Sequence, residues 1–341
     1  MRIAQVAPLG TTVQPDHAGS IEGLVWLLSR ELSSLGHEVT VFGAAGSRLP
    51  ARVELVATMP GPYGQNGSPW TWYACEWMSL CRAVEQSGRF DVMHAHNYLW
   101  SVPLTPLAGC PMVHTTHIFP YEEEASMWRQ HPEACISAVS EVQWAAYGDL
   151  RPAAIIPHGI DVAAHTFRAE PDDYLCWLGR FQPGKGPLEA IEIARSLDLR
   201  LLMAGHQNEY FHEAIAPRVD GSALEYVGPV GPVERDTLLG GARALLYPVL
   251  APEPFGLVQV EAMMSGTPVA AFGVGAAREI VEEDVTGAVE PPGGDLAAAV
   301  ERCLRLDRAR VRERARARFG ADRMTAQYAE LYAGVARGSA A

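Results

Sequence analysis

Two glutamates, Glu253 and Glu261, stand with seven residues between them where a turn gives way to a helix. Glu253 lies between two prolines, and a helical pattern then begins near Leu257 and stops at Gly266, a residue type typical of left-handed helix caps. The unpaired N–H groups and partial positive charge of a helix N-terminus can bind a phosphate or a sugar hydroxyl, and carboxylates accept hydrogen bonds from hydroxyls. The alternative is that both glutamates lie in solvent and have no role.

Two positive side chains lie in a glycine-containing loop earlier in the chain. Arg180 and Lys185, the only lysine present, are five positions apart in the stretch Gly-Arg-Phe-Gln-Pro-Gly-Lys-Gly. The guanidinium is a planar fork and the ammonium is a compact point charge, so one loop can present both cations to the same diphosphate. These residue types suit the stabilisation of negative charge.

Four histidines lie at the ends of two predicted strands: His94 and His96 on the first, and His114 and His117 on the second. Within each pair the spacing is two or three residues, and no carboxylate pattern accompanies them. This arrangement does not favour a metal site. A hydrogen bond to the backbone is one interpretation of a histidine such as His117 at the end of a strand.

Two strand–helix–strand units would position these residues. Apolar runs and helical spacing predict the first unit over 3–42 and the second over 174–205. Parallel strands in such units bind ligands beyond their carboxyl ends, where the loops 7–19 and 180–186 lie. The pattern predicts an α/β fold of two doubly wound domains facing across a cleft, with a polar, irregular stretch at 161–171 between them.

The composition indicates a globular protein of two domains that does not bind nucleic acid. The chain has 341 residues, more than one compact core usually serves, and a net charge of −13. No apolar run reaches the ~18 residues of a membrane span and the N-terminus lacks a signal-peptide layout, so we expect a cytoplasmic protein. The arginine-rich stretch 297–323 leaves a membrane surface open as a partner, although its acidic residues favour a solvated helix face.

Two other features carry less information about function. Six cysteines without a CxxC pair indicate reduced, mostly buried thiols. Aromatic residues are dense from Trp70 to Trp77 and could stack on a sugar or acceptor ring, but packing in a core or an interface is the interpretation that we favour.

The string Glu-Pro-Phe-Gly-Leu from Glu253, followed by Glu-Ala-Met from Glu261 and Gly-Thr-Pro-Val from Gly266, resembles the signature of retaining glycosyltransferases of family 4. The resemblance runs through nearly the whole chain and is strongest over 174–291 and weakest over 44–100. The short length and the C-terminal half are similar to a subgroup met in antibiotic biosynthesis, which suggests a small-molecule acceptor.

The resemblance implies a GT-B fold built from two Rossmann-like domains. Residues 1–165 would form the N-terminal, acceptor-side domain, and residues 166–322 the domain that binds the nucleotide-sugar donor. The final helix, at about 323–336, would pack back on the N-terminal domain.

The resemblance also implies roles for matching residues. Arg180 and Lys185 would bind the diphosphate, Glu261 the ribose and Glu253 the sugar, with His117 near the reacting sugar. Gly19 stands where the family usually has two adjacent glycines, and it would contact the donor. The remaining donor-binding candidates follow Glu253 directly: Phe255, Gly256 and Leu257.

The function implied is retaining transfer of a hexosyl group from a nucleotide-diphosphate sugar, UDP- or GDP-linked, to the hydroxyl of a small molecule or glycan. Positive side chains would replace a metal ion, so neither a metal nor a cofactor is expected. The alternatives are a nucleotide-sugar epimerase of the same two-domain shape and a catalytically silent sugar-nucleotide-binding protein. A dinucleotide oxidoreductase is excluded, because the loop after the first strand has only Gly10 and Gly19 and no G-x-G-x-x-G.

Overall fold

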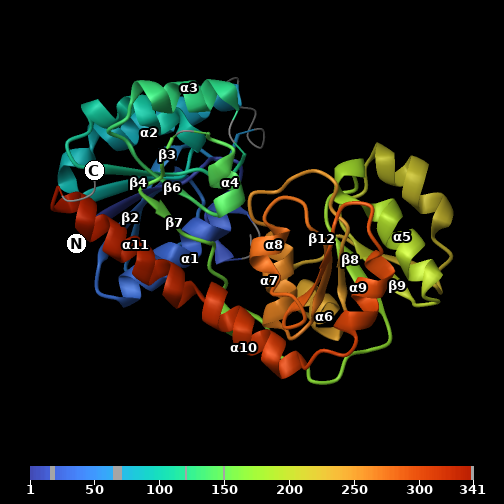
Figure 1. Cartoon of the computed structure of the whole chain (residues 1–341). Coiled ribbons are helices and arrows are strands. Elements are labelled where there is room, and N and C mark those ends of the chain that lie inside the picture. The colour runs from blue at the N-terminus through green and yellow to red at the C-terminus, as the bar shows by residue number, and fades with distance from the viewer. Residues whose placement is uncertain (16–19, 64–70, 120, 149, 339–341) are drawn as a thin grey trace. The chain divides into compact units, whose positions relative to one another are not determined.

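The computed structural model of the chain describes residues 1–15, 20–63, 71–119, 121–148 and 150–338. The chain divides into two compact units, and Figure 1 shows that each contains both helices and strands. The first unit consists of Met1–Gly159 together with Ala321–Ala341, and the second unit of Ile160–Gly320. The sequence predicts the boundaries between the units slightly later in the chain, at 165/166 and 322/323.

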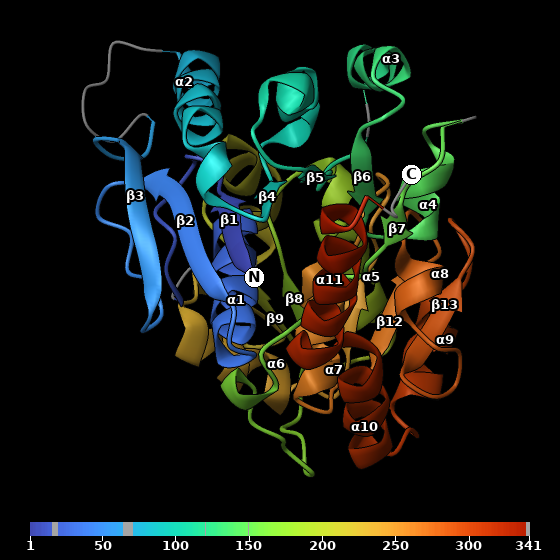
Figure 2. The same cartoon turned by 90° about the vertical axis from the view of Figure 1, so that its left-hand side faces the viewer.

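A parallel sheet forms the centre of the first unit, in the order β3-β2-β1-β4-β5-β6-β7. Figure 2 shows β3, β2 and β1 side by side. The order reverses direction between β1 and β4, which is the point where open parallel sheets bind ligands. The strands are β1 (Arg2–Val6), β2 (Glu38–Ala44), β3 (Val53–Met59), β4 (Val92–Ala95), β5 (Met112–Thr115), β6 (Cys135–Ala138) and β7 (Ala154–Ile155).

Helices cover both faces of this sheet because successive strand residues point to opposite sides. On β1, Ile3 packs with α1 and α11, whereas Ala4 and Val6 pack with α2. The C-terminal helix α11 thus belongs to the core of the first unit and contributes the buried Tyr328 and Tyr332 to it. The helices of the unit are α1 (Ile21–Ser34), α2 (Trp72–Glu85), η2 (Ser87–Arg89), η3 (Tyr98–Leu107), α3 (Glu122–Gln130), α4 (Glu141–Ala145) and α11 (Ala321–Ala336).

The second unit repeats this architecture around a six-stranded parallel sheet in the order β10-β9-β8-β11-β12-β13. Its reversal point lies between β8 and β11, and the loops that carry Lys185 and Glu253 follow these two strands. The strands are β8 (Leu175–Leu178), β9 (Leu201–Ala204), β10 (Leu224–Gly228), β11 (Leu245–Tyr247), β12 (Val269–Phe272) and β13 (Gly287–Glu290). Two parallel, doubly wound sheets confirm the predicted α/β fold class.

The helices of the second unit pack around a core of buried side chains from all parts of its sheet. In order they are η4 (Val162–Ala164), η5 (Pro183–Lys185), α5 (Pro187–Ser196), η6 (Phe211–Ile215), η7 (Ala216–Arg218), α6 (Pro232–Gly241), α7 (Leu257–Met264), α8 (Ala277–Ile280), α9 (Leu296–Cys303) and α10 (Arg308–Phe319). The predicted break near Gly320 separates α10 from α11, and a further break at 304–307 separates α9 from α10.

One arginine in the arginine-rich stretch is buried, although the sequence predicts a solvated helix face. Arg308 is 8% exposed and donates four hydrogen bonds, to the carbonyls of Arg168, Gly240 and Ala242 and to the hydroxyl of Thr267. A buried guanidinium is tolerated only when its donors are satisfied. Arg308 therefore anchors α10 to the rest of the second unit.

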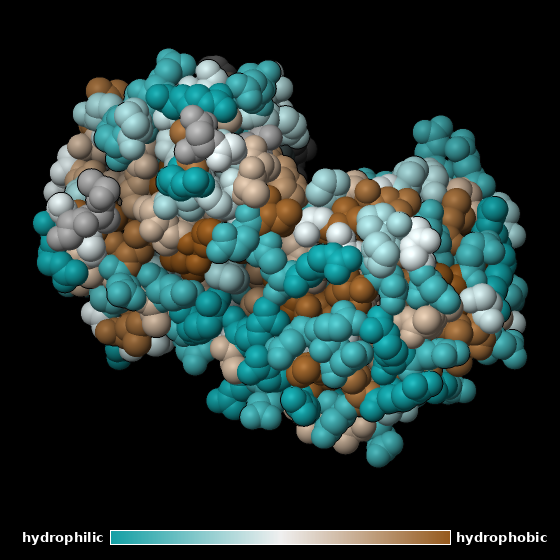
Figure 3. Space-filling model, viewed as in Figure 1, coloured by the Kyte–Doolittle hydropathy of each residue, from teal (hydrophilic) through white to brown (hydrophobic). Residues whose placement is uncertain are grey.

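The visible surface mixes residue types without one dominant apolar face. Figure 3 shows hydrophilic residues over most of the viewed face, with hydrophobic residues in separate small patches. No helix in the described part of the chain is long and apolar enough to cross a membrane.

Candidate functional site

A tight turn after β8 positions Lys185. Gly186 has φ +66°, and a Cβ at this residue would lie 1.9 Å from the carbonyl oxygen of Pro248, so only glycine fits. The indole of Trp177 donates to the carbonyl of Lys185 at 3.2 Å. The turn also holds the loop that leads to Glu253, because the N–H groups of Leu250 and Ala251 both donate to the carbonyl of Gly184, at 2.9 and 3.1 Å.

Lys185 and Glu253 form an ion pair through Nζ and Oε1. The other carboxylate oxygen of Glu253 accepts a hydrogen bond from the hydroxyl of Tyr247, the last residue of β11. Both charged side chains are largely buried, with 19% of Lys185 and 21% of Glu253 exposed. The interpretation that Glu253 lies unpaired in solvent is therefore wrong.

The electrostatics of Lys185 reflect this burial. Burial lowers the pKa of its ammonium to about 8, and the neighbouring Arg180 acts in the same direction. The Glu253 carboxylate acts oppositely, since it stabilises the ammonium. At neutral pH Lys185 is thus a cation with a weakened hold on its proton. A further negative charge nearby, such as a phosphate, would stabilise its charged form.

Arg180 lies in the same loop but is placed differently. Its side chain is exposed, and it makes no hydrogen bond or ion pair with any residue in the described ranges. The structure therefore brings Lys185 to Glu253 and leaves the Arg180 guanidinium exposed to solvent at the start of the loop.

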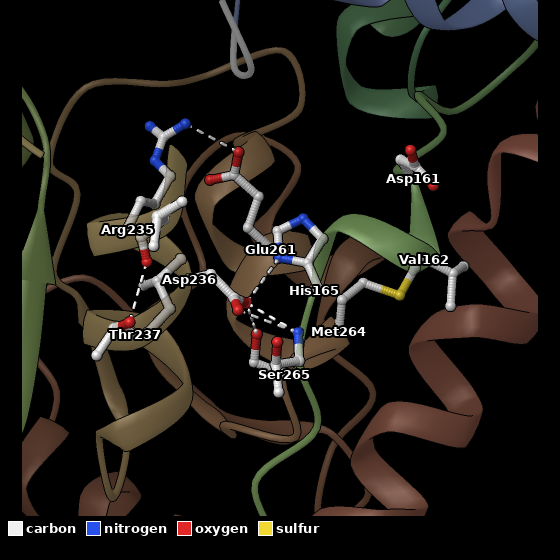
Figure 4. Close-up of polar contacts among 12 residues, drawn as sticks. Asp161, Val162, His165, Arg235, Asp236, Thr237, Glu261, Met264 and Ser265 are labelled. Atoms are coloured by element: carbon white, nitrogen blue, oxygen red, sulfur yellow. Dashed lines mark hydrogen bonds and ion pairs between the residues drawn. The ribbon is translucent and has the colours of Figure 1, made fainter. Parts of the chain in front are cut away.

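Glu261 lies inside α7 and is almost completely buried, with a 2% exposed side chain. Its Oε1 accepts a hydrogen bond from Nη1 of Arg235 at 3.0 Å, as Figure 4 shows. Its Oε2 is buried and has no hydrogen-bond partner among the described residues. A buried carboxylate oxygen without a donor is costly, so this atom is suited to accept a hydrogen bond from a ligand. Glu261 does not lie in solvent either.

The residues between the two glutamates shape the backbone. Gly256 has φ +86° and caps α7, and a Cβ there would lie 2.5 Å from both the Tyr247 hydroxyl and the Gln259 amide nitrogen. Phe255 is 3% exposed and packs edge-on against Phe319, with ring centroids 5.8 Å apart. Its ring is therefore a core side chain. Leu257 is half-buried and begins α7.

In the first unit, His117 lies two residues beyond β5 and bonds to another histidine. Its Nε2 is 3.0 Å from Nδ1 of His96, and its ring stacks on that of His158 with centroids 5.2 Å apart. No hydrogen bond joins its ring to the backbone in the described part of the chain, so that interpretation is wrong. Burial, with the neighbouring rings of His158 and His96, places the pKa of His117 well below its usual value, so the ring is neutral.

Other predicted features have mixed outcomes. Gly19 and Trp70 lie outside the described residues. Trp72, Tyr73 and Trp100 pack on one another, with Trp72 centroids 4.1 Å from Tyr73 and 4.9 Å from Trp100. Trp100 packs against the core cluster that contains Leu80, whereas Tyr73 remains 55% exposed, so these rings extend from the core of the first unit to its surface. Within the described ranges, no three histidine, cysteine, aspartate or glutamate residues are grouped as metal ligands.

Two site residues were missed from the sequence. Tyr247 could have been found as the polar residue that ends the strand before Glu253. Arg235 lies on α6, a separate helix, and nothing in the sequence links it to Glu261.

Comparison with known families identifies both halves of the chain. The family described as Glycosyltransferase Family 4 matches residues 21–164. The family described as Glycosyl transferases group 1 matches residues 163–318.

Individual proteins match over most of their length. The chain is 28% identical to a phosphatidyl-myo-inositol mannosyltransferase of Mycolicibacterium smegmatis, covering 93% of this chain and 88% of that protein. It is 29% identical to a D-inositol 3-phosphate glycosyltransferase of Kribbella flavida, covering 81% and 80%. The crystal structure of AviGT4, a glycosyltransferase involved in avilamycin A biosynthesis, superposes with a TM-score of 0.77 at 28% identity, covering 99% of this chain and 98% of that one.

Proposed function

Because the chain belongs to the GT-B glycosyltransferases, with a family 4 domain followed by a group 1 domain, we propose that it transfers a hexosyl group from a nucleotide-diphosphate sugar to an acceptor hydroxyl with retention of configuration. The observation that carries this proposal is the contact of Lys185 with Glu253. A cation suited to phosphate and a carboxylate suited to sugar hydroxyls meet at one point, and the glycosidic bond of a donor joins these two groups.

In this proposal Lys185 and Arg180 stabilise the charge that develops on the diphosphate as the bond breaks. Lys185 is already placed by the turn at Gly186 and by Glu253, so it needs little reorganisation when the charge appears. The exposed Arg180 adds a second, planar cation once the donor binds. No metal ion and no cofactor take part, and the donor is UDP- or GDP-linked.

The nucleotide is held at α7. The unpaired Oε2 of Glu261 accepts a hydrogen bond from a ribose hydroxyl, while Arg235 holds the other oxygen and orients the carboxylate. The N–H groups at the start of α7 follow Gly256 directly and add fixed dipoles for the diphosphate.

Retention follows from attack on the face that the diphosphate leaves. Glu253 binds the sugar hydroxyls and stabilises positive charge at the anomeric carbon, and the departing phosphate oxygen takes the proton of the acceptor hydroxyl. His117, neutral and with a buried nitrogen unpaired among the described residues, accepts a hydrogen bond from a substrate hydroxyl rather than acting as an obligatory base.

The acceptor is a small hydroxylated molecule. The names of two relatives specify inositol compounds as their substrates, and that of AviGT4 specifies the biosynthesis of avilamycin A. The inositol in the first two names is a polyhydroxylated small molecule, which supports an acceptor of this kind over a protein or nucleic acid.

The test is turnover with UDP-, GDP-, ADP- and dTDP-linked hexoses, alone and with inositol-type acceptors, read as release of the nucleoside diphosphate. The NMR coupling constant of the anomeric proton then gives the configuration of the product. We expect the configuration of the donor, and the opposite anomer would overturn the retaining mechanism. Release of an epimerised sugar would identify an epimerase, and thermal stabilisation by a nucleotide without turnover would identify a silent binding protein.

A further inference from the structure

A buried chain of hydrogen bonds connects the C-terminal helix of the first unit to His117. Nε2 of Gln5 donates to the hydroxyl of Tyr332 at 3.1 Å, and Nε2 of His96 lies 2.8 Å from Oε1 of Gln5. Nδ1 of His96 then lies 3.0 Å from Nε2 of His117. Gln5, His96 and Tyr332 are each at most 1% exposed, so water does not compete for these bonds.

The same tyrosine continues the chain in the other direction. The Tyr332 hydroxyl lies 2.6 Å from Nδ1 of His94, and Nε2 of His94 lies 2.7 Å from the hydroxyl of Thr115. The hydroxyl of Tyr328, the other buried tyrosine of α11, bonds to Thr115 at 3.1 Å. The chain is therefore continuous from Thr115 to His117, with Tyr332 and Gln5 at its centre.

Neutral rings make each bond depend on the next. Burial lowers the pKa of His94, His96 and His117 well below the usual value, so each ring has one N–H donor and one acceptor nitrogen. If Gln5 donates to Tyr332, its oxygen must accept from Nε2–H of His96. Nδ1 of His96 is then an acceptor, and it must receive its hydrogen bond from Nε2–H of His117.

Only one other arrangement satisfies the bonds from Tyr332 through Gln5 and His96 to His117, and it reverses all three of them. Rotating the amide of Gln5 by half a turn would move the proton of His117 from Nε2 to Nδ1. Nδ1 of His117 is buried and has no partner among the described residues. A buried N–H without an acceptor is rarer than a buried acceptor without a donor, so the reversed arrangement is the less stable one.

We propose that Gln5 and Tyr332 are positioning residues that fix His117 in its Nε2–H tautomer, so that its buried Nδ1 can only accept a hydrogen bond and selects a hydroxyl as its ligand. The identity of that hydroxyl as part of a glycosyltransferase substrate depends on the proposed function. The tautomer itself does not, because it follows from contacts within the free protein.

The tautomer can be read directly from the full chain without substrate. Long-range proton–nitrogen correlation spectra of protein labelled with 15N-histidine distinguish the protonated ring nitrogen from the bare one, and His117→Gln assigns the signal. We expect His117 to be protonated at Nε2 and bare at Nδ1. A wild-type spectrum with the proton on Nδ1 overturns the proposal.

Two tyrosine variants of α11 test whether the chain controls this tautomer. In Tyr332→Phe the Nε2–H tautomer of His117 leaves an N–H of Gln5 without an acceptor, and the reversed arrangement leaves Nδ1–H of His117 without one. The two arrangements become comparable, so His117 should become a mixture of tautomers. Tyr328→Phe is the matched control, because Tyr328 is also buried but bonds to Thr115, outside the segment from Tyr332 to His117, and it should keep the single tautomer. A single unchanged tautomer in Tyr332→Phe overturns the claim that Tyr332 fixes the tautomer of His117. If Tyr332→Phe does not fold, Gln5→Leu tests the same chain of hydrogen bonds.

Activity provides a separate reading. If the proposed function holds, Tyr332→Phe should lower kcat/KM up to about 10-fold, the scale of one neutral hydrogen bond, and Tyr328→Phe should leave it unchanged. Wild-type protein without turnover but with the Nε2–H tautomer would refute the proposed function alone. An active wild type with the Nδ1–H tautomer would refute this inference alone.

Discussion

Lys185 and Glu253 come from loops after two different strands of the second unit, yet their charges are paired. The pairing is enforced by the backbone, since Leu250 and Ala251 donate to the carbonyl of Gly184 in the turn that carries Lys185. Removing either partner would leave a largely buried charge without compensation. The contact thus couples the two loops that we assign to the diphosphate and the sugar.

Loss of the Lys185 ammonium should reduce catalysis strongly. Lys185→Ala is expected to lower kcat/KM at least ~100-fold, the scale of one lost charge-stabilising donor. Arg180→Ala should have an effect of the same order if both cations bind the diphosphate. Arg195→Ala on α5, which breaks an exposed ion pair with Glu192, is the control and should leave kcat/KM unchanged. Near-normal kcat/KM for Lys185→Ala would remove this residue from the mechanism.

The pH dependence of activity should follow the proton of Lys185. Burial lowers its pKa to about 8, so kcat/KM of the free enzyme should fall as the pH rises above this value and the cation is lost. In Lys185→Arg, if active, the fall should disappear because a guanidinium keeps its proton. The same fall in Lys185→Arg would assign the titration to another group.

Stability should change with pH in the opposite sense. Because the pKa in the folded state, about 8, is below the unfolded value of 10.5, the folded protein binds fewer protons than the unfolded chain between these values. The unfolding free energy of the wild type relative to Lys185→Met should therefore rise from pH 8 to 10.5. Denaturant unfolding of both proteins across this range measures the difference, and a falling difference would contradict the burial of a weakened cation.

The two glutamates should separate by ligand. Glu261→Gln should weaken binding of a free nucleoside diphosphate, because it replaces an unpaired carboxylate oxygen assigned to the ribose. Glu253→Gln should not weaken that binding, because it leaves the Lys185 ammonium free to pair with the diphosphate, and it should lower kcat, because Glu253 is assigned to the sugar. Isothermal titration calorimetry with the diphosphate alone distinguishes them. Equal weakening by both substitutions would refute the division of roles.

Activity should persist when divalent metals are removed. Lys185 and Arg180 are assigned the charge stabilisation that a metal supplies in other transferases, so turnover in excess EDTA should match turnover in buffer. Activity that disappears in EDTA and returns with Mg²⁺ or Mn²⁺ would show that these two side chains do not suffice.

The sequence by itself determined the fold class and the stretches that carry the site. Buried parallel strands are short apolar runs, and their helices have a 3.6-residue period, so β1, β8 and β12 could be placed from local pattern. Gly256 and Gly266, both at positive φ, are local signals too, because their conformations disfavour other side chains.

Only the tertiary structure decided which side chains meet. Phe255 lies in the motif but packs in the core, whereas Tyr247 and Arg235 lie outside it and bind its two glutamates. The bonds from Tyr332 through Gln5 to His96 join residues from opposite ends of the chain. Such contacts depend on strand order, register and helix packing, which bring distant residues together, and no local spacing in the sequence records them.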